Sequence, residues 1–295
     1  MFVRGTQRRR SDAGGRLEEA CSNVAVPHQT PGSDSPDSSV LPNIARIRNF
    51  WLNGSRHNDD DREMAQRIEL CGPHIPYLVR AQRSLVRRQV RHLFASGITQ
   101  FLDLGSGLPE CDYVHHVVQA LDPECRVAYV DFDASLEADS KELVADADNT
   151  AFVVADCRDV DGVLGHPEVR AVFDPSRPFA VLMTELLLHV PDEADPAGLV
   201  ASYVDAMPSG SYLAISHFGE DDQVLEGFQI FEGLRFGRFP AVNLRSREQV
   251  GKLFDGLDLV APGVVPVPLW HPEPDDEVLR NPSEVRMYTG LARKN

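Results

Sequence analysis

Residues 101–107, with the sequence FLDLGSG, constrain the fold of this chain more than any other segment. A short apolar run, of the length of a buried strand, ends in two glycines that are one position apart. Glycine has no side chain, so a ligand can lie against such a turn and against the start of the following helix. The segment predicts a strand followed by a nucleotide-binding type of turn, although ordinary tight turns share the pattern.

Short apolar runs alternate with helix-like stretches beyond this turn. The predicted strands cover residues 100–104, 126–130, 151–155, 178–182 and 211–216, and the predicted helices cover residues 112–121, 134–147 and 197–207. Such alternation is typical of a parallel sheet with helices on both faces. The last third is less regular, with predicted helices at 222–234 and 246–254, a proline-rich loop at 262–274 and a strand at 284–292. We therefore expect a Rossmann-like α/β fold.

The chain before the first strand divides into two parts. Residues 1–41 are rich in Gly, Ser, Asp, Pro and Arg and show almost no apolar periodicity, which predicts a disordered tail. From residue 42, apolar residues such as Ile44, Ile47 and Phe50 recur at helical spacing, and a second series extends to Gly97. We expect a helical lobe over residues 42–97 and a Rossmann-like domain over residues 98–295, with a cap insertion at about 219–245.

Composition excludes several classes of protein. The 295 residues carry 45 acidic and 29 basic side chains and a formal net charge of −16, which gives no general attraction to nucleic acid or to anionic membranes. The five cysteines form no C-x-x-C pair for zinc or redox chemistry, the sequence contains no membrane-spanning run, and we expect no export signal. We expect a cytoplasmic protein that binds no metal and acts on a small molecule. The protein could also form a homodimer.

Acidic residues follow the predicted strands at the edge where open α/β folds bind ligands. A carboxylate at Asp131, after the second strand, can accept both ribose hydroxyls of an adenosine, while Phe132 packs on the adenine ring. Asp156, after the third strand, can accept from the adenine amino group. Each aspartate alone could instead cap a helix. Their joint placement, with Asp103 in the first strand, predicts a nucleoside site.

Glu110 narrows the choice of nucleoside. It occupies the position of the third glycine in the dinucleotide pattern G-x-G-x-x-G, where an acidic side chain is a poor neighbour for a pyrophosphate. NAD and FAD are therefore disfavoured. S-adenosylmethionine carries no phosphate, and its positively charged amino-acid end suits a nearby carboxylate.

Together these motifs resemble the class I methyltransferase pattern. In that pattern a glycine turn binds the cofactor, an acidic residue after the second strand binds its ribose, and residues after the third strand contact its adenine. A longer match, from about residue 42 to residue 294, resembles the actinobacterial S-adenosyl methyltransferase family, formerly catalogued as a domain of unknown function. The residues that carry it are Ile44, Ala45, Arg46, Phe50, Trp51, Leu52, Asn53, Gly54, Asn58, Asp61, Arg62, Glu63, Arg80, Ala81, Gln82, Arg83 and the segment 97–109.

The resemblance implies S-adenosylmethionine as the cofactor, a seven-stranded, mostly parallel sheet with its last strand reversed, and a helical lobe that closes over the site. It also implies that Asn53, Gly54 and Arg83 lie near the methionine end of the cofactor or near the acceptor, although these could equally be helix-end or surface residues. The expected cofactor-binding residues are Asp103, Gly105, Ser106, Gly107, Asp131, Phe132, Asp156, Cys157, Thr184, Asn53, Gly54 and Arg83.

Methyl transfer is an in-line displacement at a sulfonium, so the protein mainly aligns and desolvates the reactants. A hydroxyl or amine acceptor also needs a base, and the candidates at the ends of the fourth and fifth strands are Glu185, His189 and His217. His189 lies in an apolar turn and could instead be structural, and Glu185 could instead hold a charge of the acceptor or cap a helix. The adjacent His115 and His116 have no third ligand at metal spacing, so we expect both on a helix surface.

Aromatic and basic residues in the insertion after the fifth strand are interrupted by glycines. The pattern favours a mobile cap over an apolar acceptor pocket, although aromatic residues at helical spacing are usually core. The residues concerned are Phe228, Phe231, Arg235, Phe236, Arg238 and Phe239.

The favoured hypothesis is an S-adenosylmethionine-dependent methyltransferase that acts on a small molecule, in secondary metabolism. The alternatives are a protein of this fold that binds S-adenosylmethionine without methyl transfer, as a regulator, or one that uses the sulfonium for cyclisation or elimination. A nicotinamide dehydrogenase is a further alternative, which Glu110 opposes.

Overall fold

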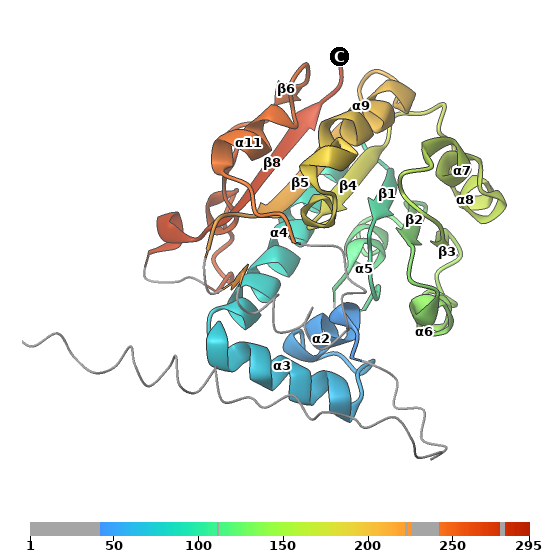
Figure 1. Ribbon diagram of the computed structural model, residues 1–295. Coiled ribbons are helices and arrows are strands. Elements are labelled where there is room, and N and C mark those ends of the chain that lie inside the picture. The colour runs from blue at the N-terminus through green and yellow to red at the C-terminus, as the bar shows by residue number, and fades with distance from the viewer. Residues whose placement is uncertain (1–41, 111, 222–223, 226–241, 278–280) are drawn as a thin grey trace, which may run out of the picture. The chain divides into compact units, whose positions relative to one another are not determined.

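A mostly parallel sheet runs through the part of the chain that the structure describes (Figure 1). The structure is a computed structural model, and it describes residues 42–110, 112–221, 224–225, 242–277 and 281–295. The parallel strands are β1 (Gln100–Leu104), β2 (Arg126–Asp131), β3 (Thr150–Val154), β4 (Ala180–Thr184) and β5 (Tyr212–Phe218). The others are β6 (Asp258–Leu259), β7 (Val265–Pro266) and β8 (Met287–Arg293).

The strand order is β3-β2-β1-β4-β5-β8-β6, and β7 pairs with β8. Strand β8 runs antiparallel to β5, from Phe218 opposite Met287 to Tyr212 opposite Arg293. The predicted Rossmann-like sheet with its last strand reversed is confirmed. The two-residue strand β7 makes this an eight-stranded sheet, where seven strands were predicted.

Helices connect the strands. The helical lobe contains α2 (Ile44–Trp51), α3 (Asp59–Cys71) and α4 (Ile75–Ala95). The remaining α-helices are α5 (Val114–Gln119), α6 (Glu137–Leu143), α7 (Val160–Gly165), α8 (Pro167–Val172), α9 (Pro196–Ala206) and α11 (Arg247–Lys252). Short 3₁₀ turns are η1 (Ala134–Leu136), η2 (Leu187–His189), η3 (Asp192–Ala194), η4 (Val267–Leu269) and η5 (Pro282–Glu284).

Alternate residues of the strands face two apolar clusters, as the period of two in a strand requires. Phe101 of β1 and Tyr129 of β2 belong to the cluster that includes α4 and α5. Leu102 and Val130 belong to the other, which α8, α9 and α11 complete. Both faces of the sheet are therefore covered, and its ligands must approach along an edge or at the strand ends.

The carboxyl half of α4 fixes the helical lobe to the rest of the fold. There, Arg88 donates from Nε to the Trp270 carbonyl at 2.9 Å and from Nη2 to the Val267 carbonyl at 2.9 Å, and it forms a buried ion pair with Asp276. The other half of α4 packs against α2 and α3 and supplies Gln82 and Arg83 to the site described below.

His115 corrects one expectation. It was predicted on a helix surface, but α5 turns it toward β2, where it is buried and its Nδ1 lies 2.7 Å from the Tyr129 hydroxyl. Burial, with a smaller contribution from the adjacent His116, lowers the pKa of His115 to about 3. It is therefore a neutral core histidine at neutral pH.

Some predicted features lie outside the described residues. They are the tail at 1–41, most of the helix at 222–234 and the cap residues Phe228, Phe231, Arg235, Phe236, Arg238 and Phe239. Among the residues that are described, no helix is both long and apolar enough to span a membrane.

Candidate functional site

The turn after β1 places two glycines in the left-handed region, with φ of +67° at Gly105 and +61° at Gly107. A Cβ on Gly105 would lie 2.8 Å from Leu186 Cδ1, and one on Gly107 would lie 3.3 Å from Ala45 Cβ. Conformation therefore favours glycine at both positions, and a Cβ at Gly105 would also require the Leu186 side chain to move. The turn lies at the carboxyl end of β1, where parallel sheets bind ligands.

Asp131 ends β2 beside this turn. Its Oδ2 accepts the backbone N–H of Gly107 at 2.8 Å, and its Oδ1 accepts the backbone N–H of Asp133 at 3.0 Å. Burial raises the pKa of Asp131, although these backbone hydrogen bonds oppose the rise. Each carboxylate oxygen has two lone pairs, so each can accept one more hydrogen bond from a ligand.

Phe132 is an exposed aromatic side chain at the same strand end. It is 68% exposed, yet it lines the cavity together with Asp131. Exposed large apolar side chains often mark a binding site, where a bound ligand covers them. A flat ring also offers a stacking surface to a flat ligand. The pair of Asp131 and Phe132 thus presents a carboxylate and an aromatic face to one ligand.

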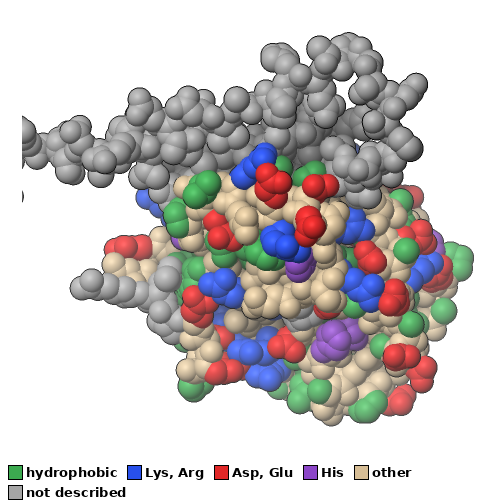
Figure 2. All heavy atoms as spheres, turned by 90° about the horizontal axis from the view of Figure 1, so that it is seen from below, with side chains coloured by type: hydrophobic (Ala, Val, Ile, Leu, Met, Phe, Trp, Pro, Cys, Tyr) green, Lys and Arg blue, Asp and Glu red, His purple; other side chains and the backbone are tan. Residues whose placement is uncertain are grey.

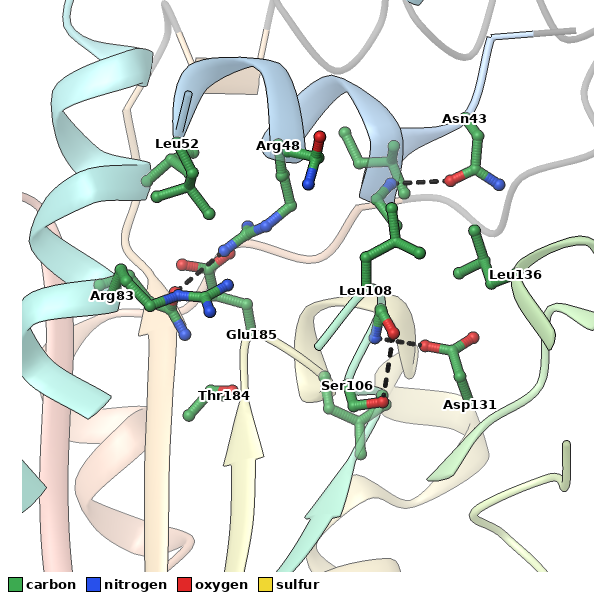
Figure 3. Close-up of a pocket in the computed structure, with 18 of the residues that line it drawn as sticks. Asn43, Arg48, Leu52, Arg83, Ser106, Leu108, Asp131, Leu136, Thr184 and Glu185 are labelled. Carbon is green, nitrogen blue, oxygen red and sulfur yellow. Dashed lines mark hydrogen bonds and ion pairs between the residues drawn. The ribbon is translucent and has the colours of Figure 1, made fainter. Parts of the chain in front are cut away.

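A cavity of about 170 Å³ lies between the strand ends and the helical lobe. Figure 3 shows Asp131, Leu136 and Asn43 on one side of it, and Arg48, Leu52, Arg83 and Glu185 on the other, with Ser106 and Leu108 between them. Helix α2 crosses above the strand ends in this view. Apolar side chains line much of the cavity: Ile44, Trp51, Leu52, Ile68, Ile75, Val79, Leu108, Leu136, Leu186, Leu188 and Phe218.

Asn43 joins the helical lobe to the strand ends. Its Oδ1 caps α2 by accepting the Ala45 backbone N–H at 2.8 Å, and its Nδ2 donates to Asp133 Oδ2 at 2.6 Å. Its own backbone N–H donates to Asp61 Oδ1 at 2.8 Å. One side chain therefore positions α2 against the loop that follows β2.

Glu185 follows β4 with a φ of +59°, and it is buried. Its carboxylate forms an ion pair with Arg48 of α2, and Arg48 Nη2 donates to Gln82 Oε1 of α4 at 3.1 Å. Burial raises the pKa of Glu185, and the Arg48 guanidinium opposes that rise. A residue other than glycine keeps this backbone conformation only when its surroundings stabilise it. Here the backbone N–H of Glu185 donates to the Ser216 carbonyl at 2.9 Å.

Arg83 enters the cavity from α4. Its Nη1 donates to the Glu110 carbonyl at 2.7 Å, and its guanidinium stacks 3.9 Å from the centre of the Tyr113 ring. The Glu110 carboxylate accepts from Asn49 Nδ2 at 2.5 Å and from Ser55 Oγ at 2.7 Å. Burial raises the pKa of Glu110, but these hydrogen bonds outweigh burial and lower it below its usual value. Glu110 is thus a carboxylate in the cavity wall.

Asp103 lies behind the glycine turn and does not line the cavity. Its side chain is buried inside β1, beside Tyr113, whose hydroxyl donates to the Ser106 carbonyl at 2.9 Å. Burial raises the pKa of Asp103 to about 7, against the opposing effects of Tyr113 and Arg83. Asp103 is therefore a buried carboxyl in β1, outside the cavity lining.

The structure brings most of the predicted site residues together. Those that line the cavity are Arg83, Gly105, Ser106, Gly107, Asp131, Phe132, Thr184, Glu185 and His189. Burial lowers the pKa of His189 to about 4, with smaller contributions from Arg48 and His217, so its imidazole is neutral at neutral pH.

Other predicted residues lie outside the cavity lining: Asn53, Gly54, Asp103, Asp156, Cys157 and His217. Asp156 is half exposed, and Arg158 Nε donates to both of its oxygens, at 2.9 and 3.0 Å. His217 is inside β5, which extends to Phe218, two residues beyond the predicted end. Arg245 Nη1 lies 2.8 Å from His217 Nε2, and burial lowers the pKa of His217 to about 4.

Sequence reasoning missed Arg48, Gln82 and Asn43 as site residues. Arg48 follows Ile44 by one helical turn and precedes Leu52 by another, so these three share one face of α2. A charged residue on the apolar face of a helix is a signal that could have identified it. The partner of Arg48, however, is distant in sequence and could not be read from the pattern.

A parallel sheet with its last strand reversed, a glycine turn after β1 and a carboxylate at the end of β2 define the fold of the class I methyltransferases. A family model described as S-adenosyl methyltransferase matches residues 30–295 of the chain. The chain belongs to this S-adenosyl methyltransferase family. It is therefore an S-adenosylmethionine-dependent methyltransferase, as the sequence motifs predicted.

Two solved structures resemble the chain over most of its length. A protein of the DUF574 family from Streptomyces avermitilis MA-4680 is 33% identical, with a TM-score of 0.78, over 86% of this chain and 98% of that one. A putative methyltransferase from Thermobifida fusca YX is also 33% identical, with a TM-score of 0.76, over 86% of this chain and 96% of that one. A search of curated proteins gave no match.

The residues present fit S-adenosylmethionine. The glycine turn lets a ligand approach the backbone closely, and the Asp131 carboxylate keeps acceptor capacity toward the cavity. The exposed Phe132 ring supplies an apolar surface beside that carboxylate. A nucleoside needs this combination of a hydroxyl acceptor and a flat stacking face.

Proposed function

We propose that the chain transfers the methyl group of S-adenosylmethionine to a small molecule that binds in the half of the cavity beside Glu185. The observation that carries this proposal is the joint lining of one cavity by the glycine turn, Asp131, Phe132 and an apolar wall from the helical lobe. The nucleoside half and the apolar half are continuous, as a transfer between two bound molecules requires.

Each part of the cavity has a proposed role. Asp131 accepts the two ribose hydroxyls, Phe132 packs on the adenine, and the Gly105–Gly107 turn lets the backbone approach the ligand. When bound, S-adenosylmethionine supplies an electrophilic methyl group on a positively charged sulfur. The chain then contributes alignment and the exclusion of water, which helix α2 and the apolar side chains favour by covering the strand ends.

Two features support a small acceptor over a macromolecule. The apolar half of the cavity is covered by α2, α3 and α4, which contribute Trp51, Ile68 and Val79. On the face that Figure 2 shows, Lys and Arg side chains are interspersed with Asp and Glu side chains. Arg56, for example, forms ion pairs with Asp139 and Glu142. Such an interspersed surface has no strong attraction for phosphates.

We also propose a cytoplasmic location. Cys125 and Cys157 are free thiols, and burial raises the pKa of each to about 11. Protonated, unpaired thiols are typical of a reducing compartment.

Thermal unfolding with S-adenosylmethionine, S-adenosylhomocysteine or NAD tests the cofactor part of this proposal. A ligand at 100 times its dissociation constant stabilises a protein by about 2.7 kcal/mol, so the first two should raise the melting temperature and NAD should not. Release of S-adenosylhomocysteine in the presence of a panel of small acceptors tests the transfer. Turnover with a protein or nucleic acid substrate alone would contradict the proposed acceptor class.

A further inference from the structure

The cavity contains a buried acceptor atom without a partner. Glu185 is 6% exposed, and its Oε2 is bonded to Arg48, whereas its Oε1 has no hydrogen-bond partner among the described residues. Glu185 lines the cavity, and Figure 3 shows it between Arg48 and Arg83. A buried oxygen that lacks a donor costs free energy, which a ligand donor in the cavity would recover.

Glu185 lies apart from the nucleoside half of the cavity. Asp131 ends β2 and Glu185 follows β4, and β1 lies between these two strands. Two strand spacings separate them by about 10 Å, which leaves room for a ribose and a sulfonium methyl. Glu185 therefore lies two strands away from the carboxylate proposed for the ribose, in the half of the cavity proposed for the acceptor.

The neighbouring charges restrict what this donor can be. Arg48 and Arg83 are both cations in the same half of the cavity, and His189 is neutral. An alkylamine, which is charged at neutral pH, would lie beside two guanidinium groups, and like charges at short range repel. A neutral hydroxyl meets no such repulsion, and an oxygen anion that forms from it would be attracted by Arg48.

The remaining wall sets the shape of the acceptor. Trp51, Leu52, Ile68, Ile75, Val79 and Leu188 surround this half of the cavity with apolar surface. Apolar walls with a few placed polar groups select a ligand with an apolar body and a single polar end.

We propose, resting on the methyltransferase function above, that the acceptor is an uncharged apolar molecule with a hydroxyl group, and that this hydroxyl donates its hydrogen bond to Glu185 Oε1. During transfer the acceptor oxygen forms a bond to the methyl carbon, and the carbon–sulfur bond breaks with its electron pair moving to sulfur. The hydroxyl proton passes to Glu185 Oε1. The products are a methyl ether, a neutral thioether and a protonated Glu185.

Binding of matched aromatic probes tests this proposal. The affinities of para-propylphenol, para-propylanisole, para-propylaniline and phenylpropylamine are measured by calorimetry, with and without saturating S-adenosylhomocysteine. A hydrogen bond to a charged group contributes about 1.5–3 kcal/mol, so the phenol should bind about 10- to 100-fold more tightly than its methyl ether. Equal affinities of these two, no binding of the phenol, or tighter binding of the aniline or the alkylamine would overturn the proposal.

The Glu185→Gln variant sharpens the test. Arg48 would hold the amide oxygen, so the amide NH₂ would take the place of Oε1 and present a donor to the cavity. The preference for the phenol over the ether should disappear in this variant. The exposed Glu142→Gln variant carries the same chemical change outside the cavity and should keep the preference. A preference that persists in Glu185→Gln would also overturn the proposal.

Binding of S-adenosylhomocysteine, measured on the same samples, separates two kinds of failure. If it does not bind the wild-type protein, the proposed methyltransferase site itself is wrong. If it binds and the phenol preference is absent, only the assignment of the acceptor is wrong. The wild-type comparison needs no variant, so it stands even if Glu185→Gln does not fold.

Discussion

The backbone N–H of Gly107 donates to Asp131 Oδ2 at 2.8 Å and so connects the turn after β1 to the strand end of β2. This bond fixes the carboxylate in the cavity wall before any ligand is present. It also depends on a backbone conformation, a φ of +61°, that favours glycine. The turn and the carboxylate that we propose for ribose binding are thus one structural unit.

We expect Gly107→Ala to weaken binding of S-adenosylmethionine as well as stability. A non-glycine residue in the left-handed region costs about 1–2 kcal/mol. The added Cβ would also press on Ala45 of α2, which would shift the N–H that holds Asp131. Chemical denaturation and calorimetry measure the two effects.

Gly97→Ala is the matched control for this change. Gly97 has a φ of +87°, and an added Cβ would meet nothing within 4 Å. It should lose a similar amount of stability while keeping its affinity for S-adenosylmethionine. Equal loss of affinity in both variants would show that backbone strain alone, and not the connection to Asp131, explains the effect.

Asn43→Ala should reduce both the stability and the cofactor affinity of the protein. The change removes the cap of α2, worth about 1 kcal/mol, and the hydrogen bond to Asp133 that positions α2 over the strand ends. Asn58→Ala removes the cap of α3 instead. It should cost similar stability and leave the affinity unchanged, and a similar affinity loss in both variants would contradict the role given to Asn43.

Titration of Asp103 should lower the free energy of unfolding as the pH rises. Its ordinary pKa of 3.8 is raised to about 7 by burial, so between these values the folded state holds a proton that the unfolded state has lost. Stability is then lost by up to about 1.4 kcal/mol per pH unit as the pH rises through this window. The free energy of unfolding of Asp103→Asn, relative to wild type, should increase from about pH 5 to about pH 7.

The exposed Asp146→Asn variant is the control for this pH dependence. Its free energy of unfolding should follow that of the wild type at both pH values. A constant difference between Asp103→Asn and wild type across the window would show that the Asp103 carboxyl titrates in the same way in the folded and unfolded states.

Asp156→Ala should affect cofactor binding much less than a change at Asp131. The Asp156 carboxylate lies outside the cavity lining and is occupied by Arg158. A hydrogen bond to the neutral adenine amino group would contribute at most about 1.5 kcal/mol, or about tenfold in affinity. If calorimetry shows that Asp156→Ala loses as much affinity for S-adenosylmethionine as Asp131→Ala, Asp156 is a main cofactor-binding residue and this prediction is wrong.

Much of the sheet could be predicted because each strand is a short apolar run between polar turns. The prediction for β1 coincides with the structure, at residues 100–104. The prediction for β4, at 178–182, is two residues early, since Pro178 and Phe179 are apolar but the pairing with β1 starts at Ala180. Where a ladder starts depends on the neighbouring strand, which a local pattern does not contain.

The site could be predicted where a residue follows a strand, and much less well where a contact joins distant elements. Asp131 and Gly107 are brought together because their strands are adjacent, as their order in the chain suggested. The pairing of Arg48 with Glu185 depends on α2 crossing the strand ends, and that packing is a long-range property of the fold. His217 was expected just after β5, but the strand continues to Phe218 and encloses it.

Titration of S-adenosylmethionine into the wild-type protein and Asp131→Ala, followed by calorimetry, tests the central claim most directly. Loss of two hydrogen bonds from ribose hydroxyls to a carboxylate should weaken binding about 100-fold or more, while the exposed Asp146→Ala control keeps the wild-type affinity. A folded Asp131→Ala protein that binds S-adenosylmethionine as tightly as the wild type would contradict the assignment of this cavity as the cofactor site.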